Sequence, residues 1–161
     1  MVRAMDPVDR AIVAALQHDG RRPQQQIADE VGLSQPAVAE RIRKLERAGI
    51  IKGYAALIDG PRVGVDVTAF VGIVIEHPRH FDAFARHIRD LPEVLECHRV
   101  AGEFTYLLKV KTANTRTLDT LLTKRLRTLP GVTRSFTTMT LLSVKESAAV
   151  PLETSPEIDH E

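Results

Sequence analysis

The chain has 161 residues, of which 43% are hydrophobic and 27% charged, and its formal net charge is +1 at pH 7. This composition is typical of a folded globular protein and excludes an intrinsically disordered chain. A net charge near zero excludes a polycation, so any affinity for phosphate must come from local basic clusters. The single cysteine, Cys97, excludes an intramolecular disulfide and a cysteine-rich zinc site. We expect a cytoplasmic protein without a membrane span, because no signal-peptide core and no long apolar run is present.

Three short helices are predicted in the N-terminal part, where apolar residues recur at helical spacing. The first begins after Asp6, whose side chain can cap it, and stops at Gly20. The second ends at Gly32, and the third occupies Gln35–Ala48. A short strand or ribbon is expected from Ile50 to Asp59, so this part is predicted to be a winged helix-turn-helix.

The C-terminal part changes to an apolar alternation of period two, which indicates strands. The predicted elements, in chain order, are a strand over 67–75, a helix over 81–91, strands over 94–100 and 104–110, a helix over 118–129 and a strand over 132–144. A similar short sequence ends each of the two predicted helices, Leu91 to Val94 in the first case and Leu129 to Val132 in the second. Two such halves predict a ferredoxin-like βαββαβ domain, with both helices on one face of an antiparallel sheet, and an α+β fold class overall.

The other face of this sheet needs a cover, because the first strand is apolar on both sides. The sheet of a second copy of the chain is the simplest structure that could bury this face, so we expect at least a homodimer. The predicted organisation is a helix-turn-helix domain over 1–59, a linker over 60–66, an effector and oligomerisation domain over 67–146, and a mobile tail over 147–161.

The spacing of Ala28, Gly32 and Val38 is typical of a helix-turn-helix that binds double-stranded DNA. Ala28 is small enough for two helices to approach, Gly32 permits a positive φ, and Val38 fills the core between them. The third helix would lie in the major groove, with its N-terminal residues nearest the base edges. Gln35 carries the amide that pairs with adenine.

Basic residues cluster on the third helix and just after it, and only Glu40 and Glu46 oppose them in that stretch. The cluster contains Arg41, Arg43, Lys44, Arg47 and Lys52, and Arg21 and Arg22 lie just before the second helix. Each phosphate contact contributes about one unit to the logarithmic salt dependence of DNA affinity. The alternative interpretation of any such cluster is a solvated helix face. The predicted DNA-binding residues are Arg21, Arg22, Ser34, Gln35, Ala37, Val38, Arg41, Arg43 and Lys44.

Short motifs in both parts carry a resemblance to a known family. They are Leu33-Ser34 followed by Val38, Arg41 and Leu45, Gly53-Tyr54, Pro92-Glu93-Val94, Gly102 followed by Tyr106-Leu107-Leu108, and Pro130-Gly131-Val132. With them the chain resembles the Lrp/AsnC, or feast/famine, transcriptional regulators from Asp6 to about Glu146. The resemblance implies a sequence-specific DNA-binding regulator that dimerises through its C-terminal sheet, assembles further into octamers, and binds an amino acid or related metabolite between dimers.

The resemblance also implies an effector cleft at the Gly102 loop, where a glycine lets backbone amides approach a ligand carboxylate. The family commonly has an aspartate where this chain has Thr105, so Glu103 substitutes for it, or the effector differs, or none binds. A plain hairpin turn and the β-propensity of threonine are the alternative explanations. The implied effector residues are Val100, Ala101, Gly102, Glu103, Thr105, Tyr106, Thr137, Thr138, Met139 and Thr140.

Enzyme motifs are not found in the sequence, so we expect no catalytic residue, metal or cofactor. His80 and His87 are two helical turns apart, whereas a zinc helix places two histidines four residues apart. The alternative function is a metabolite-binding oligomer, or an enzyme resembling the sirohaem decarboxylases, that shares this architecture without binding DNA. The basic third helix favours the regulator.

Overall fold

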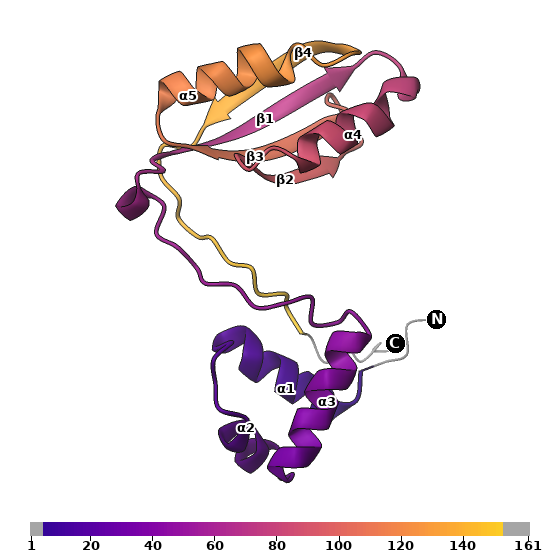
Figure 1. Ribbon diagram of the computed structural model, residues 1–161, viewed down its shortest axis with the longest axis vertical. Coiled ribbons are helices and arrows are strands. Elements are labelled where there is room, and N and C mark those ends of the chain that lie inside the picture. Colours follow the sequence, from indigo (N-terminus) through magenta and orange to yellow (C-terminus); the bar gives the residue numbers. More distant parts are fainter. Residues whose placement is uncertain (1–4, 153–161) are drawn as a thin grey trace, which may run out of the picture. The chain divides into compact units, whose positions relative to one another are not determined.

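The computed structural model describes residues 5–152, which form two compact units (Figure 1). The first unit contains residues 5–57 together with 146–152, and the second contains residues 58–145. The chain therefore passes between the units twice. Within the described residues, no helix is both long and apolar enough to cross a membrane.

The first unit is built from three helices, α1 (Pro7–His18), α2 (Gln24–Val31) and α3 (Gln35–Arg47). Their ends follow the local signals: Asp6 Oδ1 accepts a hydrogen bond from Asp9 N at 2.8 Å, and Gly32 ends α2 with φ at 69°. The helices share one apolar core, made of Ile12, Val13, Ala15, Ile27, Ala28, Val38, Ile42 and Leu45. The predicted helix-turn-helix is confirmed.

The strand or ribbon predicted over 50–59 is wrong, because this segment contains no strand residue. Ile51 packs against the helical core, but Leu57 leaves 89% of its surface exposed and Gly53 has φ at 153°, so the segment does not keep a regular extended conformation. An unpaired strand gains no ladder hydrogen bonds and is not stable alone. Residues 5–57 are thus a helix-turn-helix without a formed wing.

The segment 146–152 docks on the first unit, although the sequence predicts a mobile tail from residue 147. Val150 N donates to Gln17 Oε1 at 2.7 Å, and Gln17 Nε2 donates to Val150 O at 3.0 Å. Leu152 packs against the helical core. The rest of the predicted tail, 153–161, lies outside the described residues.

The second unit is a four-stranded antiparallel sheet in the order β2-β3-β1-β4. Its main elements are β1 (Val67–Ile75), α4 (Phe81–Arg89), β2 (Val94–Arg99), β3 (Tyr106–Thr112), α5 (Thr115–Thr120) continued by a π-helical turn (Leu121–Leu126), and β4 (Val132–Met139). Short 3-10 turns occupy Pro61–Val63 and Pro78–His80. This topology confirms the predicted βαββαβ order and the α+β class.

Several boundaries in the second unit differ from the prediction. Strand β3 lies at Tyr106–Thr112 instead of 104–110, α4 ends at Arg89 instead of residue 91, β2 ends at Arg99 instead of residue 100, and the turn after α5 ends at Leu126 instead of residue 129. Helix α5 begins three residues earlier than expected, because Asn114 caps it by accepting from Thr117 N at 3.0 Å. Strand β4 ends at Met139 instead of residue 144. Thr140 N still donates to Thr68 O at 2.9 Å, but β1 begins at Val67, so no partner strand remains beyond that point.

The helices cover one face of the sheet and leave the other face open (Figure 1). The covered face buries alternate residues of β1, including Val71 and Ile73. On the open face Phe70 is 41% exposed and Phe136 is 40% exposed. These apolar side chains form the surface that the sequence expects a partner sheet to cover.

Candidate DNA interface and effector region

Helix α3 is the candidate DNA-reading element of the first unit. Ser34 caps it, accepting from Ala37 N through Oγ at 3.4 Å. Val38, Ile42 and Leu45 bury its inner face. The opposite side and the first turn are exposed, so the predicted residues Ser34 and Gln35, together with Arg43 and Lys44, face solvent. Ala37 is half-buried.

Val38 is the one predicted DNA-binding residue that the structure removes from the surface. Its side chain has 0% exposure and belongs to the core between the helices. A side chain enclosed in this way has no route to a base edge, so the prediction of a DNA contact at Val38 is corrected. Its packing role, also predicted, accounts for the residue.

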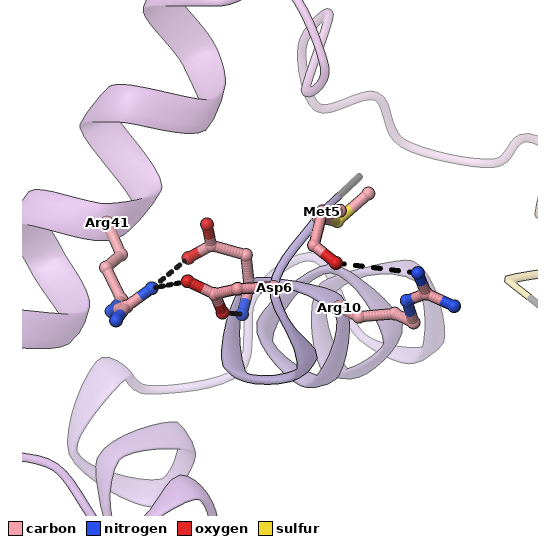
Figure 2. Close-up of polar contacts among 5 residues, drawn as sticks. Met5, Asp6, Arg10 and Arg41 are labelled. Atoms are coloured by element: carbon pink, nitrogen blue, oxygen red, sulfur yellow. Dashed lines mark hydrogen bonds and ion pairs between the residues drawn. The ribbon is translucent and has the colours of Figure 1, made fainter. Parts of the chain in front are cut away.

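Arg41 does not project from α3 as an unpaired cation. Its Nη1 lies 2.6 Å from Oδ2 of Asp6, the N-cap of α1, and 2.6 Å from Oδ1 of Asp9 in the first turn of α1 (Figure 2). The pKa of Asp6 is lowered, first because its carboxylate accepts from Asp9 N and then because it accepts from Arg41. The hydrogen bonds that Arg41 donates, first to Asp6 and then to Asp9, raise the pKa of Arg41. Arg41 thus joins α3 to the start of α1.

A second ion-pair cluster lies along the exposed side of α3. Glu40 Oε2 accepts from Arg43 Nη2 at 2.8 Å and from Arg43 Nε at 3.1 Å. Glu40 Oε1 accepts from Arg47 Nη2 at 2.9 Å. These bonds, that to Arg47 first, lower the pKa of Glu40. One carboxylate therefore holds two arginines of the predicted basic face.

The other predicted phosphate contacts differ in how they are paired. Arg22 Nη2 lies 2.6 Å from Glu30 Oε2, so Arg22 forms an ion pair with a residue of α2. The backbone N of Arg21 donates to Asp19 Oδ1 at 2.9 Å, which orders the turn before α2. Among residues 5–152, no ion pair is found for the side chains of Arg21 and Lys44. Of the predicted phosphate contacts, these two are therefore the cations most directly available.

The predicted effector loop lies between β2 and β3 and is exposed at Ala101, Gly102 and Glu103. Gly102 has φ at 146°, a conformation that side chains other than glycine rarely adopt. Val100 N donates to Thr105 O at 3.2 Å, which closes the loop. The loop thus presents its backbone to solvent.

Thr105 and Tyr106 are engaged within the fold. Thr105 Oγ1 accepts from Ile75 N at 3.0 Å, so its hydroxyl secures the end of β1. The Tyr106 ring is buried and stacks on Phe84 with centroids 4.8 Å apart. Burial raises the pKa of the Tyr106 hydroxyl. Neither residue supplies the carboxylate of the family pattern.

The predicted threonines of β4 lie toward the opposite end of the sheet from this loop. Thr105 N donates to Ile73 O, whereas Thr140 N donates to Thr68 O. These two β1 carbonyls are five residues apart, about 17 Å along an antiparallel strand. Thr137, Thr138 and Met139 are exposed between them. Thr140 therefore lies far from the Gly102 loop, whereas Thr137 pairs with Val71, two residues from Ile73.

Two further features concern ligands. A cavity of about 440 Å³ opens in the second unit beside Val63, Leu95 and Lys111, and none of the predicted effector residues lines it. Within residues 5–152, no group of three histidine, cysteine or acidic side chains is placed to hold a metal ion.

The sequence showed Glu40 beside the basic residues but did not show which carboxylates pair with them. The pairing of Glu40 could have been predicted from the sequence, because Arg43 and Arg47 follow it at helical spacing. The pairing of Asp6 and Asp9 could not, since they lie 35 and 32 residues from Arg41 in the chain.

Two family descriptions match the chain: an AsnC-type helix-turn-helix domain over residues 5–46, and an Lrp/AsnC ligand binding domain over residues 68–150. The chain belongs to the Lrp/AsnC family. The leucine-responsive regulatory protein of Escherichia coli strain K12 is 36% identical to it over 152 residues, which cover 93% of each chain.

Two solved structures of similar proteins contain an amino acid. A transcriptional regulator of Neisseria meningitidis, in complex with L-methionine, has a TM-score of 0.87 and 29% identity, over 92% of this chain and 97% of that one. A feast or famine regulatory protein of M. tuberculosis, also complexed with L-methionine, has a TM-score of 0.84 and 37% identity, over 91% and 99%.

Membership of the Lrp/AsnC family establishes the general class of function of this protein. The protein is a DNA-binding transcriptional regulator and not an enzyme, because the matched domain binds DNA and the relatives are regulators. These comparisons give no support to the alternative of a sirohaem-decarboxylase-like enzyme.

Proposed function

We propose that this regulator reads DNA through the first turn of α3 and that an amino acid binding to its second unit controls that activity. The observation that carries the DNA part is the exposed start of α3: Ser34 and Gln35 face solvent while Val38 is buried beneath them. The first turn of a recognition helix is the part that reaches base edges in the major groove.

The proposed DNA contacts divide into base readers and phosphate contacts. Gln35 has the amide that pairs with adenine, and Ser34 and Ala37 flank it. Arg21 and Lys44 contact phosphate directly, whereas Arg22 and Arg43 must first leave Glu30 and Glu40. For Arg41 we propose a structural role, in which it joins α3 to α1 through Asp6 and Asp9, instead of a contact with DNA.

The proposed effector is an amino acid or a related metabolite, bound between chains. The support is that two relatives were solved with L-methionine and that the Gly102 loop exposes backbone amides suited to a carboxylate. Glu103, exposed beside it, is the proposed partner of the ammonium group. Exposed Thr137, Thr138 and Met139 of another chain complete the cleft, together with the half-buried Thr140.

The proposed assembly is a homodimer through the open face of the sheet, with dimers grouped into octamers. The exposed rings of Phe70 and Phe136 favour this cover, since apolar surface of this kind is stabilised by burial. A regulator that acts on the cell's own DNA works in the cytoplasm, which is the location we propose.

The DNA part is tested by titrating the full-length protein into the DNA upstream of its own gene at several salt concentrations. We expect a retarded complex whose affinity falls with salt. Absence of any complex at low salt would contradict the proposal. The effector part is tested separately by a thermal shift screen of the common amino acids. A ligand should raise Tm or change the oligomer size, and no change with any of them would contradict an amino-acid effector.

A further inference from the structure

We propose that Glu40 is a specificity-determining residue: it holds Arg43 and Arg47 on α3 and keeps both cations from the phosphates of non-cognate DNA. This inference rests on the proposed role of α3 as the recognition helix. It assigns a function to an acidic residue in the middle of the predicted basic face.

The geometry uses both carboxylate oxygens of Glu40. Arg43 donates to Oε2 through two nitrogens, Nη2 at 2.8 Å and Nε at 3.1 Å, and Arg47 donates to Oε1 through Nη2 at 2.9 Å. The two arginines follow Glu40 by three and seven residues, so all three lie on one side of the helix. The side chains are 58%, 56% and 65% exposed for Glu40, Arg43 and Arg47.

Exposure makes this cluster reversible, because solvent-exposed ion pairs are weak and exchange partners. DNA offers phosphates that compete for both arginines. An arginine that leaves Glu40, however, leaves an unpaired carboxylate beside a polyanion, and like charges repel. Phosphate contacts by Arg43 and Arg47 therefore carry a penalty wherever Glu40 finds no new donor.

A suitable donor exists on the base edges of the major groove. The N4 amino group of cytosine donates to carboxylates, and no other base presents only a donor there. A site that places a cytosine near Glu40 removes the penalty and allows both arginines to reach phosphate. Glu40 thus makes a non-specific attraction conditional on sequence, in the manner of a repulsive element that rejects wrong partners.

The same helix provides a matched control. Glu46 lies on α3, carries the same charge, and accepts from the Tyr54 hydroxyl at 3.1 Å. No ion pair with an arginine is found for Glu46 among the described residues. Glu46→Gln therefore removes one negative charge from α3 without releasing a cation.

The test compares full-length wild type, Glu40→Gln and Glu46→Gln by fluorescence anisotropy. The probes are the DNA upstream of the protein's gene and a duplex of equal length with shuffled sequence, each in a KCl series. For Glu40→Gln we expect roughly tenfold tighter binding to the shuffled duplex and a salt slope steeper by about one unit for each arginine released. The ratio of cognate to shuffled affinity should fall, while Glu46→Gln stays near wild type.

A triple variant, Glu40→Gln with Arg43→Gln and Arg47→Gln, should return the slope on shuffled DNA to the wild-type value or below. Equal effects of Glu40→Gln and Glu46→Gln would overturn the inference, because charge alone would then explain them. Unchanged or weaker binding by Glu40→Gln to shuffled DNA would overturn it as well. Failure of wild type to prefer its upstream DNA would count against the proposed function alone, since the comparison on shuffled DNA still judges Glu40.

Discussion

Arg41 on α3 donates to Asp9 on α1, with Nη1 2.6 Å from Oδ1, and the same nitrogen reaches Asp6 at 2.6 Å (Figure 2). Asp6 also caps α1 through the Asp9 N–H. The start of the first helix and the middle of the DNA-reading helix are therefore fixed by one set of charge-assisted hydrogen bonds. Arg41, which the basic sequence pattern would assign to DNA, therefore joins α3 to the start of α1.

Replacing Arg41 should affect stability more than DNA electrostatics. Arg41→Ala leaves two carboxylates close together without their cation, so we expect the Tm of the first unit to fall by several degrees. Calorimetry of the full chain measures this. Arg41→Lys keeps the charge and should recover part of the loss. A variant Arg41→Ala with unchanged Tm and a shallower salt slope would instead identify Arg41 as a phosphate contact.

The contact between Arg41 and Asp6 also predicts that the stability of the first unit falls at low pH. The pKa of Asp6 is lowered in the folded chain from 3.8, so its contribution is fully present above that value and is lost as pH falls through the folded pKa. Hydrogen exchange of α1 and α3 amides should report weaker protection at pH 2 to 3. In Asp6→Asn the contribution is absent at every pH, so this loss should be smaller. Equal acid sensitivity in both proteins would contradict the role of Asp6.

Local signals in the sequence were sufficient for most helix ends and for the order of the strands. Caps such as Asp6 and Gly32 act within one turn, so their effect is visible in a short stretch of sequence. The end of β4 was not predictable in this way, because it depends on where β1 begins in space. The pairing of Arg41 was hidden for the same reason, since its carboxylates come from another helix.

The effector region was predicted least completely. The Gly102 loop was visible as a turn, but the position of Thr137 to Thr140 along the sheet depends on the register of β4 against β1. The proposed cleft between two chains would have no signature in the residue spacing of one chain. The open face of the sheet, by contrast, was foreseen from the two-sided apolar pattern of the first strand.

Lys44 should contribute to DNA affinity without contributing to stability. No ion pair is found for it in residues 5–152, and it lies on the exposed side of α3. Lys44→Ala is expected to lower the salt slope by about one unit for each helix bound and to weaken all sequences alike. Calorimetry should give an unchanged Tm. A selective loss on the upstream DNA alone would instead indicate a base contact.

Leu152 should stabilise the first unit from the far end of the chain. It packs on the helical core while the nearby Val150 exchanges two hydrogen bonds with Gln17. Leu152→Ala should lower the free energy of unfolding by about 1 kcal/mol, as expected for a partly buried side chain. Leu142→Ala, at a position 78% exposed, is the control and should have little effect. Equal effects in urea denaturation would show that the docking of 146–152 contributes nothing.

The open face of the sheet should carry the dimer. Phe70→Glu places a charge in an apolar surface, so sedimentation is expected to show a shift toward monomer at micromolar concentration. Phe70→Leu keeps the apolar character and should remain a dimer. A dimer of unchanged strength in Phe70→Glu would assign the interface to another surface.

We propose that an exposed recognition helix on this regulator reads DNA sequence. The most direct measurement is the affinity of the full-length protein for the DNA upstream of its gene and for a shuffled duplex, by anisotropy at near-physiological salt. We expect the upstream DNA to bind at least about a thousandfold more tightly, and Gln35→Ala to reduce that ratio. Equal affinity for the two duplexes across the salt series would contradict the claim.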